Sequence, residues 1–199
     1  MTRRVRLSDS APISDVPAVN RAAALIRQVI ADSPVPEDSG HAENTLHWLL
    51  RMRPKANDAL RLAALAHDIE RAREDRFQRH QFSDYDSFKQ AHAQKSADIT
   101  DAILAHAGVT FELRRVVHQL IQRHETGGDP DSDLLKDADS LSYFDHNLGA
   151  YYSREGYAET LRRARWGYRR LSARARKYYG HIRHEDETLN RLLEEARYP

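Results

Sequence analysis

The chain has 199 residues, with 31 lysines and arginines against 30 aspartates and glutamates, 11 histidines and no cysteine. This length suits one domain with a substantial core, and the lack of cysteine excludes disulfides, thiolate metal sites and a cysteine nucleophile. The formal net charge of +1 provides no overall attraction to nucleic acid. No run approaches the ~18 apolar residues of a membrane-spanning helix, and the first ten residues lack the apolar run of a secretory signal. We therefore expect a soluble, cytoplasmic protein that does not contact a membrane.

The elements expected along the chain are all helical. Residues 1–15 mix arginine, serine, aspartate and proline without periodicity and are expected to form a loose arm. Beyond them, apolar residues recur at helical spacing between breaker-rich segments, and no stretch alternates apolar and polar residues over strand length. The predicted helices cover residues 16–31, 41–52, 55–73, 83–107, 111–124, 132–149, 158–179 and 185–196. We predict an all-α fold, one compact domain over 16–199 built as a bundle of about seven or eight helices.

The segment LAALAHDIER (62–71) places His67 and Asp68 at the end of a helix that is apolar on nearly every side. A buried, ionised aspartate needs hydrogen bonds or a cation, and the adjacent neutral imidazole makes a divalent metal a suitable partner. An isolated His-Asp pair is more often a structural cap at a helix end. The pair alone therefore leaves both interpretations open.

Further residues of metal-ligand type lie on inward faces of other predicted helices. His41 opens one helix, His92 lies on an apolar stripe of another, and His124 lies on the apolar face of a third. The segment LLKDADSL places Asp137 and Asp139 in an otherwise apolar helix. Because two positions are ~200° apart around a helix, only one of these two can face a shared site. A metal is the ordinary reason for several such residues to face inward together.

This pattern resembles the HD-domain superfamily of metal-dependent phosphohydrolases. In that family a histidine is followed, one helix later, by a His-Asp pair and then by a distant aspartate in an Ala-Asp-x-Leu context. Here the matching residues are His41, His67 with Asp68, and Asp139 in the sequence ADSL. The resemblance covers about residues 41–145 and selects Asp139 over Asp137, which then has a supporting or ion-paired role.

The resemblance implies hydrolysis of a phosphate ester of a small metabolite or nucleotide by a metal-activated water. Family members with two metals carry two histidines between the His-Asp pair and the last aspartate, and the segments HAQKSADI and VVHQLIQRHE supply them here. The implied ligands of one or two divalent metals are His41, His67, Asp68, His92, His124 and Asp139, with Asp68 bridging. These nitrogen and oxygen donors admit Mn, Fe, Co, Ni, Zn or Mg.

Three residues near the motifs, besides Asp68, are candidates for catalytic roles. Lys95, one turn after His92, is the first candidate to contact phosphate, and the alternative is a solvated lysine. Arg71 can reach the mouth of the site or form a surface ion pair with a nearby acid. Glu70 is a candidate general base for water, or else a partner of a neighbouring arginine.

Residues 161–177, within the predicted helix at 158–179, contain eight arginines and lysines and no acid. One interpretation is that an arginine or two reaches the site of a polyphosphorylated or nucleotide substrate. A second is contact with nucleic acid, and a third is a solvated face balanced by acids elsewhere. The near-neutral charge of the whole chain favours the third interpretation and makes nucleic acid the least favoured.

The leading interpretation is thus a phosphohydrolase acting on a small phosphorylated substrate, with two alternatives from other classes. Some HD-fold proteins resemble di-iron oxygenases, which use six ligands of these types with a lysine near the position of His92. The other alternative is a non-catalytic binding module that a structural metal stabilises. The substrate, the native metal and the oligomeric state do not follow from the sequence.

Overall fold

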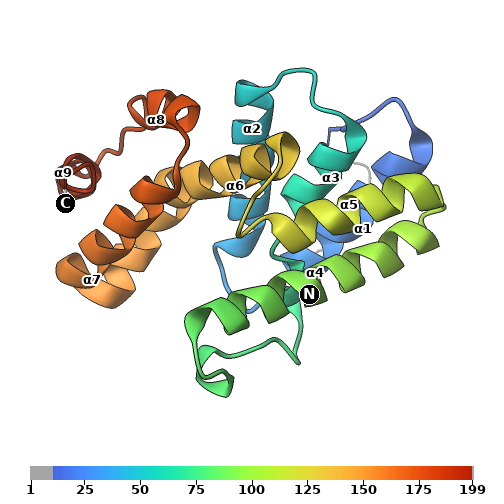
Figure 1. Ribbon diagram of the computed structural model, residues 1–199, viewed down its shortest axis with the longest axis horizontal. Helices are drawn as coiled ribbons and strands as arrows, with labels where there is room; N and C mark the ends of the chain where they lie inside the picture. The colour runs from blue at the N-terminus through green and yellow to red at the C-terminus, as the bar shows by residue number, and fades with distance from the viewer. Residues whose placement is uncertain (1–10, 199) are drawn as a thin grey trace, which may run out of the picture.

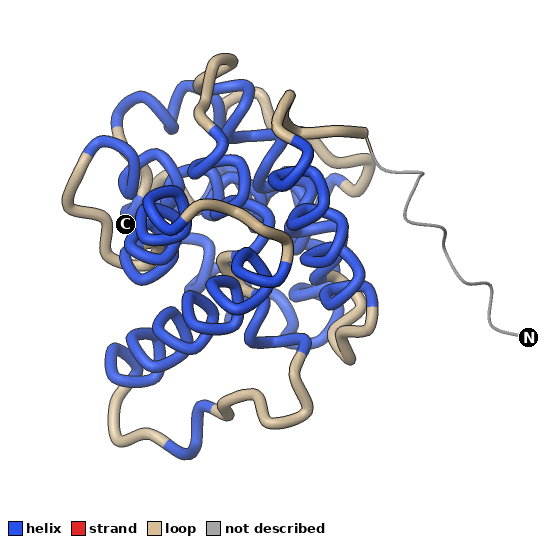
Figure 2. The backbone as a smooth tube through the Cα atoms, turned by 90° about the vertical axis from the view of Figure 1, so that its right-hand side faces the viewer, coloured by secondary structure: helices blue, strands red, loops and turns tan. Residues whose placement is uncertain are grey.

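The computed structural model describes residues 11–198, and every regular element in this part of the chain is a helix (Figures 1 and 2). The α-helices are α1 (Pro17–Ala31), α2 (Asp38–Met52), α3 (Asp58–Ala66), α4 (Tyr85–His106), α5 (Phe111–Arg123), α6 (Pro130–Ser142), α7 (Leu148–Arg170), α8 (Ala173–Tyr179) and α9 (Glu187–Glu195). Two short 3₁₀ turns, η1 (Ile69–Ala72) and η2 (Arg79–Gln81), lie between α3 and α4, and a π-helical turn, η3 (Tyr143–Asn147), joins α6 to α7. The prediction of a compact all-α bundle is confirmed.

The predicted loose arm at 1–15 lies for the most part outside the described residues. In the described part, Ile13 is buried, its backbone nitrogen donates to Oδ1 of Asn20 at 2.9 Å, and its carbonyl accepts from Arg61. The hydroxyl of Ser14 donates to Asp58 at 2.8 Å. Ile13 and Ser14 therefore attach this segment to α1 and α3, which differs from the loose arm expected there.

Helix α3 is the central helix, because its sequence is apolar on almost every side and α1, α2, α5 and α6 pack around it. Asn57 caps it by accepting a hydrogen bond from the backbone nitrogen of Leu60 at 2.9 Å. The predicted helix at 55–73 is too long at both ends. The chain leaves α-helical geometry at Asp68 (φ −107°, ψ 14°), so His67 and Asp68 stand at the end of the central helix.

The predicted basic helix at 158–179 is two helices. Helix α7 starts at Leu148, bends at Gly156, where φ is +75°, and ends at Arg170. Ser172 is extended and caps α8 by accepting from the backbone nitrogen of Ala175 at 3.1 Å. The side chain of Asp137 accepts from the backbone nitrogen of Ser172 at 2.9 Å. This interaction ties the break between α7 and α8 to α6.

The helices form two groups with α2 and α6 between them. In Figure 1, α1, α3, α4 and α5 lie on one side and α7, α8 and α9 on the other, while α2 and α6 pack against each other between the two groups. None of the helices in the described part of the chain has both the length and the apolar character needed to cross a bilayer.

Candidate metal site

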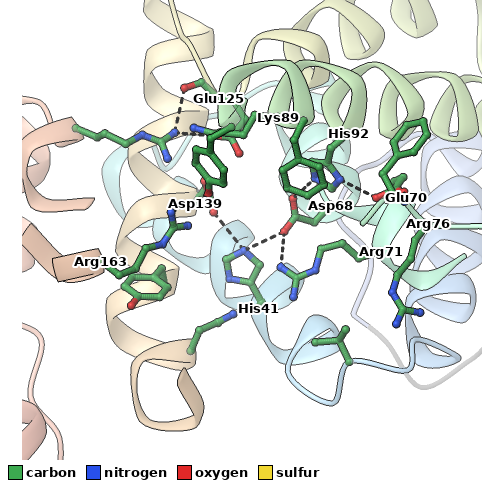
Figure 3. Close-up of a pocket in the computed structure, with 17 residues that line it drawn as sticks. His41, Asp68, Glu70, Arg71, Arg76, Lys89, His92, Glu125, Asp139 and Arg163 are labelled. Carbon is green, nitrogen blue, oxygen red and sulfur yellow. Dashed lines mark hydrogen bonds and ion pairs between the residues drawn. The ribbon is translucent and has the colours of Figure 1, made fainter. Parts of the chain in front are cut away.

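The six predicted metal ligands come together from five helical segments. Four of these ligands, His41, Asp68, His92 and Asp139, line one pocket (Figure 3). His41 is in α2, His67 and Asp68 follow α3, His92 is in α4, His124 follows α5, and Asp139 is in α6. The ligand atoms form two groups, and within each group they lie within 4.8 Å of one another: His41, His67 and Asp139 in the first; Asp68, His92 and His124 in the second. The four histidines are between 1% and 6% exposed. Each group can hold a metal ion.

Two of the histidines are anchored by backbone carbonyls of the helices that carry them. Nδ1 of His67 lies 3.0 Å from the carbonyl oxygen of Ala64, and Nδ1 of His124 lies 2.7 Å from that of Ile121. A carbonyl oxygen only accepts, so Nδ1 carries the proton in both rings. In the neutral imidazole the lone pair is then on Nε2, the nitrogen that faces the other ligands.

The other two histidines are anchored by side chains. Nδ1 of His41 lies 2.9 Å from the hydroxyl of Ser142, which itself donates to the carbonyl oxygen of His41 at 3.1 Å, so the hydroxyl accepts from Nδ1. Nδ1 of His92 lies 2.8 Å from Glu70. Partners of this kind fix the tautomer and the orientation of metal-binding histidines. All four rings thus direct Nε2 toward the carboxylate of Asp68 or Asp139.

The ligand atoms of the first group lie so close together that a cation or a proton is needed between them. Nε2 of His41 lies 3.2 Å from Nε2 of His67, and both nitrogens face Asp139 at 3.2 and 3.6 Å respectively. Two nitrogen lone pairs at this separation repel each other unless positive charge lies between them. The donor set therefore fits a bound metal ion.

The second group adjoins the first through Asp68. One carboxylate oxygen of Asp68 lies 2.9 Å from Nε2 of His92 and 3.8 Å from Nε2 of His124. The other oxygen lies 3.9 Å from Nε2 of His41, a member of the first group. Asp68 is therefore placed between the two groups.

The ionisation of the site follows from this packing of imidazoles on carboxylates. Burial acts to lower the pKa of His67, but Asp68 and Asp139 outweigh it and raise that pKa to about 9. Burial is outweighed in the same way at His92, where the carboxylates raise the pKa to about 10. Burial would raise the pKa values of Asp68 and Asp139, yet the facing imidazoles hold both well below the usual range. Both carboxylates are thus ionised and available to a cation.

Of the two aspartates in α6, the structure places Asp139 with the histidines. Asp137 is 4% exposed and points to the other side of the helix, where it accepts from Ser172. The residue pattern alone did not decide between Asp137 and Asp139, and only the family resemblance selected Asp139. The structure shows that Asp137 has a partner of its own, Ser172, away from the histidines.

Glu70 does not occupy the position expected of a general base. Its side chain is 2% exposed, with one oxygen at Nδ1 of His92 and the other accepting from the backbone nitrogen of Phe77. Because both oxygens are engaged in this way, Glu70 supports His92 and has no free oxygen for water. It acts on the site through His92.

Lys95 does not contact the pocket, contrary to the prediction. Its ammonium lies 3.0 Å from the carboxylate of Asp75, 4.0 Å from Oε1 of Glu70 and 4.6 Å from the centre of the Phe77 ring. It therefore holds the segment between η1 and η2 and places a positive charge near Glu70. Lys89, which precedes His92 by three positions on the same helix, lines the pocket instead. The sequence analysis did not identify Lys89.

Arg71 lies at the pocket, which is one of the two positions predicted for it. Its guanidinium is 2.9 Å from Asp38 and 3.1 Å from Asp68, and it lines the pocket beside the metal-ligand groups. Burial acts to lower the pKa of Arg71, but Asp68 and Asp38 raise it above its ordinary value. Arg71 is therefore a fixed positive charge next to Asp68.

The pocket has a volume of about 250 Å³ and a cationic wall that the sequence analysis predicted only in part. Arg163 and Arg170 of α7 line it together with Lys89, and Figure 3 labels Arg163 and Lys89. These two arginines belong to the basic segment at 161–177, for which access to the site was one of three interpretations. The helical spacing of that segment alone does not show which arginines face inward.

The fold and the site define an all-α protein with two adjoining, buried His/Asp groups able to hold metal ions. A family model described as a domain of unknown function, DUF4202, matches residues 14–192, and the chain belongs to this family. Comparisons with curated proteins and with solved structures gave no match.

Proposed function

We propose that the protein is a metal-dependent phosphohydrolase that cleaves a phosphate ester of a small metabolite or nucleotide. The observation that carries the proposal is the set of four imidazoles, each anchored at Nδ1, whose Nε2 atoms face two ionised carboxylates in a pocket with a cationic wall. The resemblance of the motifs to HD-domain phosphohydrolases supports it.

In this proposal each of the two ligand groups holds one metal ion. His41, His67 and Asp139 would hold one ion, and Asp68, His92 and His124 a second, with Asp68 adjacent to both. The nitrogen and oxygen donors suit Mn, Fe, Co, Ni, Zn or Mg. A divalent metal bound there lowers the pKa of a water molecule from ~15.7 toward ~7 and neutralises phosphoryl charge.

The residues of the chain bind and orient the substrate. Arg71, held in place by Asp38 and Asp68, donates to a phosphoryl oxygen beside the ligand groups. Glu70 keeps the proton of His92 on Nδ1 and so keeps Nε2 available. The overall reaction consumes one water, breaks the ester P–O bond and releases an alcohol and inorganic phosphate.

The charge of the pocket favours a phosphorylated substrate over the alternatives. The six-ligand set also suits a di-iron oxygenase, and a structural metal would suit a binding module. Arg71, Lys89 and Arg163 line the same small pocket, and the two alternatives account for them only if their ligand is also anionic. Cationic side chains that converge on a metal site match the charge that phosphoryl transfer must stabilise.

Phosphate release from a panel of nucleotides, sugar phosphates and aryl phosphates, with Mn²⁺, Co²⁺ or Ni²⁺ added, tests the proposal. Turnover should vanish in His67→Ala and Asp68→Ala, while His106→Ala, which removes an exposed histidine of α4, should retain it. About two iron ions per chain with substrate-dependent O₂ uptake would favour the oxygenase. Thermal stabilisation by metal without turnover of any compound would favour the binding module.

A further inference from the structure

Three cationic side chains that line the pocket surround one indole ring. Nζ of Lys89 lies 4.6 Å from the centre of the Trp166 ring, Cζ of Arg163 lies 4.4 Å from it, and Cζ of Arg170 lies 4.5 Å from it. Cation–π contacts at such distances are attractive and orient the charged groups. All three cations line the pocket that contains the metal-ligand groups. We call Lys89, Arg163 and Arg170 the Trp166 cluster.

The Trp166 cluster carries more positive charge than its neighbours balance. Glu125 faces two of its members, with Oε2 2.6 Å from Lys89 and 2.9 Å from Arg170. Arg163 pairs with no carboxylate in the part of the chain that the structure describes; it donates instead to the hydroxyl of Tyr85 at 2.9 Å. Within ion-pair distance, three positive charges face one negative charge, a local surplus of two. Asp139 acts on Arg163 at longer range and belongs to a metal-ligand group. A phosphate monoester, with about −1.5 to −2 charges at neutral pH, matches that surplus.

The Trp166 cluster is separate from the cation beside the metal-ligand groups. Figure 3 shows Arg71 next to Asp68, whereas Arg163 lies across the pocket from Asp68 and His92. Arg71 is already held by two carboxylates, Asp38 and Asp68. The pocket therefore offers two positions for anionic groups in a space of about 250 Å³. One is at the metal-ligand groups, where a bound metal would add to the charge of Arg71, and the other is at the Trp166 cluster.

We infer that the substrate carries two phosphoryl groups, one beside Arg71 at the metal-ligand groups and a second bound by Lys89, Arg163 and Arg170. The substrate class is thus a small organic compound with two phosphoryl groups, of a size that a pocket of about 250 Å³ admits. The inference rests on the proposed function for the fate of the first phosphoryl group. Binding of the second phosphoryl group needs no metal. The inference and the proposed function can therefore be tested separately.

The anion site is tested with inorganic pyrophosphate and the chelator-treated, full-length protein by isothermal titration calorimetry. We expect saturable binding, weakened about tenfold or more in Arg163→Ala because charge-assisted hydrogen bonds are lost. Arg162→Ala is the matched control, since the adjacent Arg162 pairs with Glu159 on the exposed side of α7. Circular dichroism and thermal unfolding establish that both variants are folded.

Two results would overturn the anion site. One is the absence of saturable pyrophosphate binding up to about 10 mM; the other is equal affinity in Arg163→Ala, Arg162→Ala and the unaltered protein. Malonate in the same titration tests whether the group is a phosphoryl group, because the cluster should bind this dicarboxylate more weakly than pyrophosphate. Tighter binding of malonate would overturn the phosphoryl assignment.

Turnover by the metal-loaded protein then tests the substrate class with matched pairs. Fructose 1,6-bisphosphate is compared with fructose 6-phosphate, and adenosine 3′,5′-bisphosphate with adenosine 5′-monophosphate. We expect kcat/KM to favour the compound with two phosphoryl groups about tenfold in at least one pair, and Arg163→Ala to remove the preference through KM. Pyrophosphate binding without any turnover would overturn the proposed function alone. Turnover that is equal within each pair and insensitive to Arg163→Ala would overturn the inference and leave the proposed function standing.

Discussion

The carboxylate of Glu70 lies 2.8 Å from Nδ1 of His92, and Nε2 of the same ring lies 2.9 Å from Asp68. Glu70 belongs to η1, the short turn that begins directly after the His67–Asp68 pair. The segment that supplies two ligands therefore also supplies the group that orients a third ligand, on α4. The break at the end of α3 and the position of His92 thus depend on each other.

Glu70→Gln tests this dependence, because it keeps the shape of the side chain and removes its charge. We expect metal affinity to fall about 10- to 100-fold, as is typical when a partner of a metal-binding histidine is altered. Competition with a chromogenic chelator measures the affinity. Glu74→Gln is the control, since Glu74 is exposed and close in sequence. An affinity equal to that of the control would show that the Glu70–His92 contact does not support metal binding.

The two aspartates of α6 show how far the sequence could predict the site. The all-α fold, the inward histidines and the His-Asp pair followed from apolar periodicity. Periodicity left Asp137 and Asp139 open because both lie in an apolar helix. The deciding partner of Asp137 is Ser172, 35 residues further along, at a break between α7 and α8 in a segment whose pattern predicts one continuous helix. A contact of that range has no signal in local spacing.

Alanine substitution at the two aspartates should produce different defects. Asp139→Ala removes a ligand from the first group, so we expect loss of metal binding in a folded protein. Asp137→Ala leaves the backbone nitrogen of Ser172 without its acceptor, which should lower the free energy of unfolding by about 1–3 kcal/mol. Metal content by elemental analysis and urea unfolding distinguish the two. Metal loss in Asp137→Ala together with retention in Asp139→Ala would reverse the assignment.

The lysines of α4 show a second limit to what the sequence could predict about the site. Lys89 and Lys95 lie three positions before and three positions after His92, so helical spacing places both on its face. Which of them contacts the pocket depends on tertiary neighbours. Asp75 and Phe77 engage Lys95, whereas Glu125 and Trp166 engage Lys89. The sequence analysis identified the correct helix face and selected Lys95, whereas Lys89 is the lysine that lines the pocket.

Lys95→Ala should therefore affect mainly the segment between η1 and η2. Its effect on the metal site should be small, because Lys95 reaches the site only through Glu70, 4.0 Å away. An exposed ion pair such as that with Asp75 contributes about 0–1 kcal/mol, so we expect a small decrease in stability. Limited proteolysis should become faster within residues 73–78, while metal affinity should fall far less than in Glu70→Gln. Complete loss of metal binding in Lys95→Ala would contradict this view of Lys95.

Asp129 connects the stability of α6 to the placement of Asp139. It caps α6 by accepting from the backbone nitrogens of Asp131 and Ser132, both at 3.0 Å, and from the hydroxyl of Ser132 at 2.7 Å. These hydrogen bonds from Ser132 lower the pKa of Asp129 from 3.8 to about 2. Replacing such a cap by alanine should cost about 1 kcal/mol of stability.

The depressed pKa predicts a pH dependence with a definite sign. The folded state favours ionised Asp129, so its contribution is fully present above pH 3.8, the ordinary pKa, and is lost as the pH falls toward about 2. Asp129→Asn is the matched control, because asparagine caps a helix about as well as aspartate and does not titrate. Urea unfolding of metal-free protein at about pH 5, 3.5 and 2.5 should show the unaltered protein losing stability relative to Asp129→Asn as the pH falls. A stability difference that stayed constant over this range would show that the cap is not selective for the ionised form, and that α6 owes its start to hydrogen-bond geometry alone.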